Sequence, residues 1–371
     1  MKVPHNNVSP SFSDLLLTWY RQNKRDLPWR KTRDAYRILV SEIMLQQTQV
    51  QTVIPYYHRF LKEFPNFSML AAASMGRVLK LWEGLGYYSR ARNLHMLAKT
   101  VVRRHRGTLP SDYVQLLALP GIGRYTAGAV LSIAYDLDFP VVDGNVMRVF
   151  CRYFGITEDI SKLAVQKQLW DLAHRHLPSG KAGDYNQALM ELGATICTPR
   201  SPACLLCCLA PTCAAYAQGR QNEWPVKRKK GIVPHKQIGA GVIWHGEKIL
   251  ISQRPVDGLL GGLWEFPGGK LEPGETLPKC VAREIREELG IKVKVGKKML
   301  AVDHAYSHFT ITLHVYECHY VSGKPQKLGV MDWRWIKPQE LRRYAFPAAN
   351  QPIIAQLLDQ SHIVQADPSL S

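Results

Sequence analysis

The spacing of apolar residues changes once along the chain, and this change limits the fold more than any other feature. From about Phe12 to Ile196, apolar residues recur every three or four positions, and Gly and Pro mark the connections. From Ile238 to Ser252 apolar and polar residues alternate around His245-Gly246, a pattern typical of a β-hairpin. A chain of 371 residues is also long for one core. We therefore expect a multidomain protein, with an all-α domain followed by an α+β domain.

The same patterns predict the individual elements and the domain limits. In the first domain, 1–218, we expect helices within Asp34–Gln47, Met75–Trp82, Arg90–Val102, Gly128–Ala134, Val146–Phe154 and Ala164–His176. In the second, 237–360, we expect the hairpin, a loop at Gly261–Gly274, a helix at Val281–Leu289, and strands near Thr310–His319 and Asp332–Ile336. The basic segment 219–236 is predicted to be a solvated linker, and such a linker can also lie along DNA phosphates. Residues 361–371 are predicted to form a flexible tail.

Composition narrows the class of partner. Lys and Arg number 48 against 30 Asp and Glu, a net charge of +18, which favours a polyanionic partner such as nucleic acid or an acidic membrane surface. An apolar fraction of 46% excludes a disordered chain. No run of 18 apolar residues is present, and the N-terminus lacks the apolar core of a signal peptide. We expect a soluble protein of the cytoplasm.

The segment Leu117–Gly128, LALPGIGRYTAG, predicts a tight turn between two helices. Gly121 and Gly123 have no Cβ, so the backbone can turn sharply and approach a ligand closely. The N–H groups at the start of the following helix then form an anion site. An ordinary helix–helix turn is the alternative, but the net positive charge favours a contact with a nucleic-acid phosphate.

Two acids stand in settings that suggest chemistry. Glu42 lies inside the apolar helix SEIMLQQTQV, where a carboxyl group is costly to bury unless it has a partner or a function. Asp143 follows an apolar pair and precedes a glycine, so it is either a helix N-cap or a catalytic carboxylate. A carboxyl that stays protonated in an apolar wall, with a second that stays ionised in polar surroundings, is the pair that glycosidic cleavage needs.

These motifs together resemble one family. The first domain is similar to the helix-hairpin-helix DNA glycosylases of the endonuclease III superfamily, and specifically to the MutY-type adenine DNA glycosylases. The resemblance covers about residues 12–215 and rests on LPWR (27–30), SEIMLQQTQV (41–50), GLGYYSRARN (84–93), LPGIGRYTAG (119–128) and VVDGNVMRV (141–149).

The resemblance implies roles for these residues. Glu42 is then the general acid that protonates adenine at N7, and Asp143 stabilises or traps the oxocarbenium-like sugar. Tyr125 hydrogen-bonds near Asp143, and Asn145 helps to place the water. Bifunctional relatives have a lysine where this chain has Tyr125, so a monofunctional glycosylase with little strand nicking is expected. Arg30 and Gln187 match the adenine pocket, while Gln47, Thr48, Leu85 and Tyr87 match residues beside the opposing 8-oxoguanine.

Five of the eight cysteines lie between Cys197 and Cys213, which indicates a metal site rather than disulfides. Four of them form C-x6-C-x2-C-x5-C, a spacing that alone suits either zinc or a [4Fe–4S] cluster. Resemblance to the glycosylase family favours one [4Fe–4S] cluster, which braces a loop that helps to present basic residues to DNA. Its ligands are Cys197, Cys204, Cys207 and Cys213; Cys208 is spare, and Cys151, Cys280 and Cys318 are expected to be buried.

The second domain contains a complete Nudix signature. Its specified positions are Gly269, Glu275, Arg283, Glu284, Ile285, Glu287, Glu288, Gly290 and Ile291. Glu284, Glu287 and Glu288 share one helical face without a paired cation in this interpretation, which predicts a Mg²⁺ or Mn²⁺ ion. In MutY-type proteins a MutT-like domain reads the 8-oxoguanine, and by that resemblance Ser307 and His308, after Tyr306, contact the lesion.

The sequence thus predicts a base-excision-repair enzyme that removes adenine opposite 8-oxoguanine or guanine in double-stranded DNA. A glycosylase for thymine or another mismatched base is the alternative within repair. A nucleoside-polyphosphate hydrolase acting through the intact Nudix box is the alternative of another class, as an additional or the main activity. A lesion-binding protein without catalysis is the third, and no feature favours it. We expect a monomer associated with the bacterial nucleoid, with no membrane partner.

Overall fold

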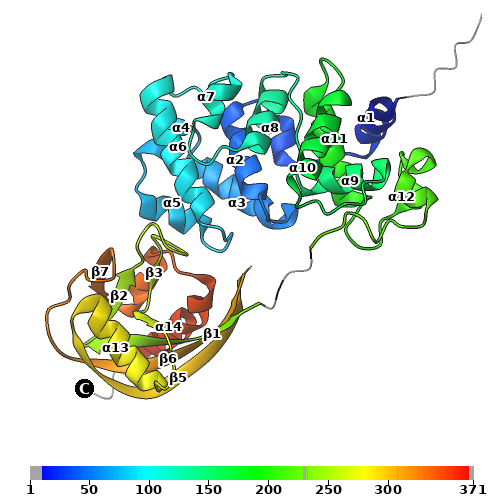
Figure 1. Cartoon of the computed structure of the whole chain (residues 1–371). Coiled ribbons are helices and arrows are strands. Elements are labelled where there is room, and N and C mark those ends of the chain that lie inside the picture. The colour runs from blue at the N-terminus through cyan, green and yellow to red at the C-terminus, as the bar shows by residue number, and fades with distance from the viewer. Residues whose placement is uncertain (1–10, 229–230, 232, 307, 367–371) are drawn as a thin grey trace, which may run out of the picture. The chain divides into compact units, whose positions relative to one another are not determined.

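The computed structural model describes residues 11–228, 231, 233–306 and 308–366. Contacts within the chain divide it into two units, Met1–Ala71 with Met96–Lys229, and Ala72–His95 with Lys230–Ser371. Helices dominate the first part of the sequence and strands the second, as predicted (Figure 1). The expected domain limits differ from this division in placing Ala72–His95 with the helices that precede it. Within the described residues, none of the helices has both the length and the apolar character needed to cross a bilayer.

The helical part consists of short helices joined by tight turns. They are α1 (Phe12–Asn23), η1 (Pro28–Lys31), α2 (Ala35–Leu45), α3 (Val50–Glu63), α4 (Phe67–Ala72), α5 (Met75–Trp82), α6 (Ser89–His105), α7 (Tyr113–Leu117), α8 (Arg124–Ala134), α9 (Gly144–Phe154), α10 (Leu163–Arg175), α11 (Ala182–Thr195), η2 (Cys204–Leu206), η3 (Ala210–Thr212) and α12 (Ala214–Ala217). All six helices expected from the apolar spacing are present.

One apolar core holds α1, α8, α9, α10 and α11 together. Phe150 of α9, Tyr185 and Leu189 of α11, and Leu16 of α1 are fully or almost fully buried in it. Helix α2 packs on α8, and α11 packs on both α8 and α9. This arrangement matters for the site, because α2, α8, α9 and α11 each supply side chains to one cavity.

The second part is a mixed sheet between helices (Figure 1). Its strands are β1 (His235–His245), β2 (Lys248–Gln253), β3 (Trp264–Glu265), β4 (Gly268–Lys270), β5 (Lys292–Ala305), β6 (Thr310–Ser322) and β7 (Asp332–Ile336). The order is β3-β2-β1-β6-β5, with β4 paired to β1 and β7 to β2. The predicted hairpin is confirmed, since β1 and β2 are antiparallel on either side of Gly246. Strand β5 and the parallel pairing of β1 with β6 were not predicted.

Each face of this sheet has its own apolar core. On one face Val281, Ile285 and Leu289 of α13 (Leu277–Leu289) pack against Ile243 and other strand residues. On the other, Ile353 and Leu357 of α14 (Gln351–Ala366) pack against the strands, together with η4 (Pro338–Arg343) and η5 (Ala348–Asn350). Helix α14 runs to Ala366, so the segment expected as a flexible tail begins within a helix.

The start of the predicted linker is packed rather than solvated. Trp224 is buried, and its carbonyl accepts a hydrogen bond of 2.9 Å from Nε of Arg152. The carbonyl of Val226 accepts another from the backbone N–H of Ile160. Trp224 is an aromatic residue within an otherwise basic segment. Its burial attaches this segment to the helical unit.

Candidate active site

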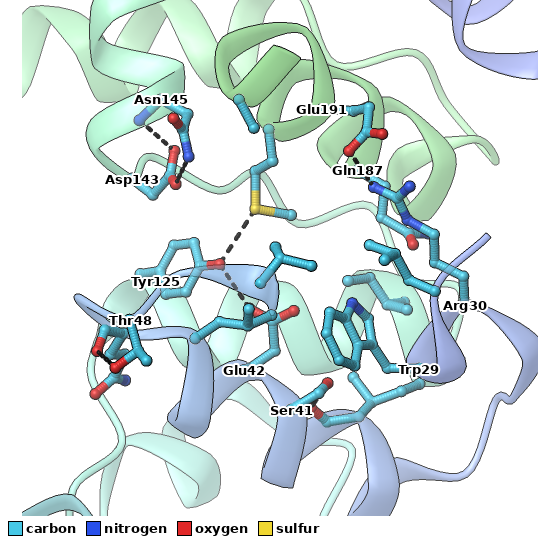
Figure 2. Close-up of a pocket in the computed structure, with 18 of the residues that line it drawn as sticks. Trp29, Arg30, Ser41, Glu42, Thr48, Tyr125, Asp143, Asn145, Gln187 and Glu191 are labelled. Carbon is cyan, nitrogen blue, oxygen red and sulfur yellow. Dashed lines mark hydrogen bonds and ion pairs between the residues drawn. The ribbon is translucent and has the colours of Figure 1, made fainter. Parts of the chain in front are cut away.

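A cavity of about 420 Å³ opens between α2, α8, α9 and α11. Figure 2 shows its side chains, with Glu42 and Asp143 on different elements and Tyr125 beside both. The cavity brings together eight of the residues predicted from the sequence: Arg30, Glu42, Gln47, Thr48, Tyr125, Asp143, Asn145 and Gln187. Glu42 and Asp143 are about 100 positions apart in the sequence, and they line one cavity as the predicted chemistry requires.

Glu42 is a buried acid on α2, with 4% of its surface exposed. Burial disfavours the charged carboxylate, so it raises the pKa of Glu42 to about 7, although the hydrogen bond from Tyr125 opposes this rise. The hydroxyl of Tyr125 donates to Oε2 of Glu42 at 2.6 Å. The sequence predicted a hydrogen bond of Tyr125 near Asp143 without naming the acceptor. The acceptor is Glu42, because α8 packs directly on α2, and Asp143 lies close enough to Tyr125 to contribute to the rise of its pKa.

Asp143 is the N-cap of α9, one of the two alternatives that the sequence left open, and it also lines the cavity, so the second alternative stays a prediction. Its Oδ1 accepts from the backbone N–H of Asn145 and Val146 at 2.9 and 2.8 Å, and its Oδ2 accepts from the Asn145 amide at 2.9 Å. Burial raises the pKa of Asp143 as well, but these donors oppose the rise. The two carboxyl groups therefore differ in the number of hydrogen-bond donors that reach them. Several donors favour the charged form of Asp143, whereas one phenol reaches Glu42.

Asn145 is fixed from its other side by Arg148. The Oδ1 atom of Asn145 accepts from NH2 of Arg148 at 2.8 Å, and the same guanidinium donates to the carbonyl of Gly193 at 2.6 Å. Its Nε donates to the carbonyl of Cys197 at 2.6 Å. Both groups of the Asn145 amide therefore have protein partners, and Arg148 joins the first turn of α9 to the segment that follows α11.

The sequence did not reveal the ion pairs at the opposite end of the cavity. Glu191 of α11 is 1% exposed and lies 2.7 Å from NH2 of Arg25 and 2.9 Å from NH2 of Arg30. Burial alone would raise the pKa of Glu191, but the bonds from Arg25 and Arg30 outweigh it and lower the pKa to about 2. Glu191 follows Met190 and precedes Leu192, so an acid among apolar helix residues, the signal that drew attention to Glu42, is present here too.

Comparison with known proteins places this cavity in a family. A model of the HhH-GPD superfamily of base excision DNA repair proteins matches residues 40–175, and a NUDIX domain model matches 239–356. The chain is 38% identical to an adenine DNA glycosylase of Rattus norvegicus, over 92% of this chain and 77% of that protein. It is 37% identical to one of Buchnera aphidicola, over 81% of this chain and 85% of that protein. The chain belongs to the adenine DNA glycosylase family.

A solved structure agrees with the fold of the helical part. A thermostable thymine-DNA glycosylase is 35% identical, with a TM-score of 0.52, and covers 56% of this chain and 95% of that one. The match to the adenine DNA glycosylase of Rattus norvegicus, in contrast, extends over the Nudix part as well.

The remaining residues expected to contact DNA in this family lie in two turns. Gly121, in the turn between α7 and α8, has a φ of +78°, a left-handed conformation that glycine adopts readily. Gly123 is the N-cap of α8 and offers no side-chain cap, so the first N–H groups of that helix keep their hydrogen-bonding capacity. In the turn between α5 and α6, Tyr87 is 40% exposed at a φ of +47°, whereas the side chain of Leu85 is buried.

The four predicted cluster ligands surround one small cavity, which Cys208 does not line. Burial raises the pKa of Cys204, and the neighbouring thiols of Cys197, Cys207 and Cys213 raise it further, which reflects their proximity. NH1 of Arg152 donates to Sγ of Cys197 at 3.3 Å. In the described part of the chain, no three His, Cys, Asp or Glu side chains converge closely enough for a single metal ion. Four cysteine thiols around a common space are a ligand set that both zinc and [4Fe–4S] clusters use.

The cysteine loop exposes apolar side chains and one cation. Leu205 and Leu206 are 88% and 71% exposed, and Arg200, the one cation between Cys197 and Cys213, is exposed as well. That the loop helps to present basic residues to DNA stays a prediction. The other cysteines are as predicted, since Cys151, Cys280 and Cys318 are buried.

The Nudix carboxylates are not unpaired, which corrects the prediction. NH1 of Arg283 lies 3.0 Å from both Glu284 and Glu287, and its Nε lies 2.9 Å from Glu275. Glu288 does not take part in these ion pairs. Its Oε2 is buried and has no hydrogen-bond partner among the described residues. Burial raises the pKa of Glu288 to about 8, with further contributions from Glu265 and Glu284. The arginine of the signature thus pairs with the outer acids, whereas the positive charge of Arg254 only partly opposes the rise in the pKa of Glu288.

The predicted lesion-reading loop is described in part. Ser307 lies outside the described residues. His308 is exposed, and the ring of Tyr306 lies 4.9 Å from that of Phe309, centroid to centroid, in a tilted arrangement.

Proposed function

We propose that this protein removes adenine from mispairs with 8-oxoguanine or guanine in double-stranded DNA by hydrolysing the N-glycosidic bond. The observation that carries this proposal is the pair of carboxyl groups in one cavity. Glu42 has a pKa near neutrality, and Asp143 is held by several donors. The adenine DNA glycosylases to which the chain is similar support the choice of adenine, and their similarity covers far more of the chain than that of the thymine-DNA glycosylase.

The chemistry follows from the leaving group. Neutral adenine leaves poorly, so Glu42 donates a proton to N7 while the C1′–N9 bond breaks. The sugar gains oxocarbenium character, which the Asp143 carboxylate stabilises or traps. Water then adds at C1′. Because both groups of the Asn145 amide already have partners, we propose that Asn145 fixes the Asp143 carboxylate, and that any part in placing the water is secondary.

The cavity has no amine at the position that would attack C1′. Tyr125 has a phenol there, so we propose a monofunctional enzyme that leaves an abasic site and does not nick the strand. Arg30 and Gln187 line the cavity wall and are proposed to hold the extruded adenine. Gln47, Thr48, Leu85 and Tyr87 are proposed to lie against DNA near the opposing base; Leu85 is buried and would act through its backbone.

A mismatch panel tests the proposal. Single-turnover excision is measured on duplexes that differ only in the mispair, for wild type, Glu42→Gln and Asp143→Asn, with strand breaks scored before and after alkali. We expect adenine release opposite 8-oxoguanine and guanine, breaks only after alkali, and losses of at least about a hundredfold in both variants. Release of thymine without adenine would overturn the proposal, as would full activity in either variant.

We propose that Cys197, Cys204, Cys207 and Cys213 hold one [4Fe–4S] cluster. When bound, the cluster supplies a rigid cross-link for the loop and no chemistry at the base. Arg152 donates to the Cys197 thiol and to the carbonyl of Thr198 at 2.7 Å, so it orients the first ligand from outside. Iron and sulfide analysis of the purified protein distinguishes this cluster from zinc.

For the second part we propose that Ser307 and His308 read the 8-oxoguanine, and that Mg²⁺ binds near Glu284, Glu287 and Glu288. The partnerless oxygen of Glu288 supports the metal, because Mg²⁺ needs only one or two carboxylates and water. The pairing of Arg283 with Glu284 and Glu287 does not favour nucleotide hydrolysis as the main activity. We expect Mg²⁺ to raise the melting temperature of wild type but not of Glu288→Gln. His308→Ala should reduce the preference for 8-oxoguanine over guanine.

A further inference from the structure

Met190 lies at the centre of the proposed acid machinery without a role in it. Its sulfur on α11 is 3.2 Å from the Tyr125 hydroxyl, which itself lies 2.6 Å from Oε2 of Glu42 (dashed lines in Figure 2). Met190 is half-buried and lines the same cavity as both residues. The hydroxyl therefore has two acceptors within reach, one on α2 and one on α11.

A phenol has a single proton, so it can satisfy only one of these acceptors at a time. The ionised Glu42 is the stronger acceptor, because a hydrogen bond to a charged group is roughly twice as strong as one to a neutral group. Once Glu42 is protonated, its advantage over the thioether decreases. The sulfur is thus a usable partner in the state of the enzyme that is ready to donate a proton to the base.

We propose that Met190 is a positioning residue for the general acid: it accepts the Tyr125 hydroxyl when Glu42 carries its proton, and so releases that carboxyl to face the extruded base. This inference depends on the proposed role of Glu42. It predicts that the sulfur favours the protonated form of Glu42. A side chain of the same size without an acceptor keeps the hydroxyl on Glu42 and favours the ionised form.

The other titratable groups around Glu42 are charged, so none of them is a neutral hydrogen-bond acceptor for Tyr125. Asp143, at the N-terminus of α9, is a negative charge that already has its own donors. Arg30 of η1 is a cation whose guanidinium is paired with Glu191. Glu191 of α11 is paired with both Arg25 and Arg30. Met190 is the neutral acceptor among them, so replacing it alters the acid without removing a charge.

The test is a double-mutant cycle read as a pH profile. Single-turnover adenine excision is measured from pH 5 to 9 for wild type, Met190→Leu, Tyr125→Phe and the double variant. In wild type we expect the rate to fall as pH rises through about 7, because Glu42 must be protonated to act in the proposed mechanism. Met190→Leu should move this fall to lower pH and reduce the rate above it roughly fivefold, the size expected for one hydrogen bond. In the Tyr125→Phe background the same change should alter the rate less than about twofold.

Two further variants separate this role from packing. Leucine conserves the volume of methionine, so Met190→Leu should fold. Met147→Leu is the matched control, because that methionine packs against the same apolar core with its sulfur 3.6 Å from Gln166, and it should leave the pH profile unmoved. Met190→Gln supplies an amide oxygen as acceptor and should keep the fall at or above the wild-type pH.

Three outcomes would overturn the inference. One is a uniform loss of rate in Met190→Leu with no change of profile, and another is an equal effect in the presence and absence of the Tyr125 hydroxyl. The third is a Met190→Gln profile that matches Met190→Leu. If Glu42→Gln retains full excision, the proposed function fails instead. An inactive Glu42→Gln together with an unmoved Met190→Leu profile refutes this inference alone.

Discussion

The burial that suits Glu42 to its proposed role also lowers the stability of the folded protein as pH rises. The reason is that its carboxyl is protonated more readily in the folded protein than in the unfolded chain. Its pKa is about 7 against a usual 4.5, so the folded state holds a proton that the unfolded chain releases between these values. The native state therefore loses stability as pH rises from about 4.5 to 7. Glu42→Gln has no charge to bury, and we expect it to gain up to about 3 kcal/mol in unfolding free energy relative to wild type between pH 5 and 8.

Urea unfolding at both pH values measures this difference. Glu158 is an exposed acid, and Glu158→Gln serves as the control, with no comparable change expected. If the two variants respond equally to pH, Glu42 does not carry the penalty that its burial implies.

Glu191 presents the opposite case, an acid that is buried as an ion. Removing its charge leaves Arg25 and Arg30 without a partner, and breaking a buried pair is strongly destabilising. We expect Glu191→Gln to lower the unfolding free energy by about 3 kcal/mol at pH 7. Asp26→Asn removes an exposed pair with Lys31 at 2.7 Å and should lower it by less than about 1 kcal/mol. Similar losses in the two variants would contradict the account.

The contrast between Glu42 and Glu191 shows what sequence reasoning can reach at single residues. An acid among apolar helix residues drew attention to Glu42, and the resemblance named its role. The same pattern surrounds Glu191, but the partners that distinguish it, Arg25 and Arg30, are more than 150 positions away. The hydrogen-bond acceptor of Tyr125 could not be named from the sequence for a related reason. Spacing identifies the face of a helix, whereas the packing of α8 on α2 decides which acid a hydroxyl meets.

Among the elements, α9 is the one whose placement matters most, because its first turn holds Asp143 and Asn145. Helix α11 approaches this turn at Gly193, where a Cβ would lie 2.6 Å from the Cβ of Asn145. Gly193→Ala should therefore displace the turn. We expect at least about a tenfold loss of excision and a loss of about 2 kcal/mol in unfolding free energy.

The matched control for this substitution is Gly76→Ala in α5. A Cβ there meets nothing within 4 Å, so alanine should stabilise the helix by up to about 1 kcal/mol without affecting excision. Single-turnover excision and urea unfolding of both variants check the prediction. Normal excision in Gly193→Ala would mean that the turn tolerates the displacement.

Elements were predicted well where one segment carries its own signal. The helices of the first part follow from apolar spacing, and the β1–β2 hairpin follows from alternation around Gly246. The pairing of β1 with β6 does not, because parallel strands are joined through a long stretch of other structure. Strand β5 was missed because lysines interrupt its alternation at Lys297 and Lys298, where the strand has bulges.

At the scale of the whole chain, the positive charge and the proposed active site are distributed differently along the sequence. The excess of 18 positive charges belongs to the entire sequence, whereas the cavity that holds Glu42 and Asp143 lies within the helical unit. Charge therefore predicts attraction to any DNA, whereas the cavity supplies the carboxyl groups of the proposed excision chemistry. The basic segment after Gly219 shows the limit of charge as a guide, since Trp224 within it is buried in a folded unit.

Because net charge and the cavity contribute separately, we expect ionic strength to change the affinity for DNA more than the preference for one mispair over another. Each phosphate neutralised by Lys or Arg releases a counterion, so affinity for duplex DNA falls steeply with ionic strength. For six to ten phosphate contacts we expect the affinity for an unmismatched duplex to fall by roughly 10³ to 10⁵ between 50 and 200 mM salt. The ratio of excision rates on adenine opposite 8-oxoguanine and opposite guanine, measured with enzyme saturating, should stay nearly constant. Fluorescence anisotropy over a salt series gives the first quantity and single-turnover excision the second. A flat binding series would show that the positive charge does not contact phosphates, and a ratio that collapses with salt would show that selectivity rests on charge rather than on base contacts.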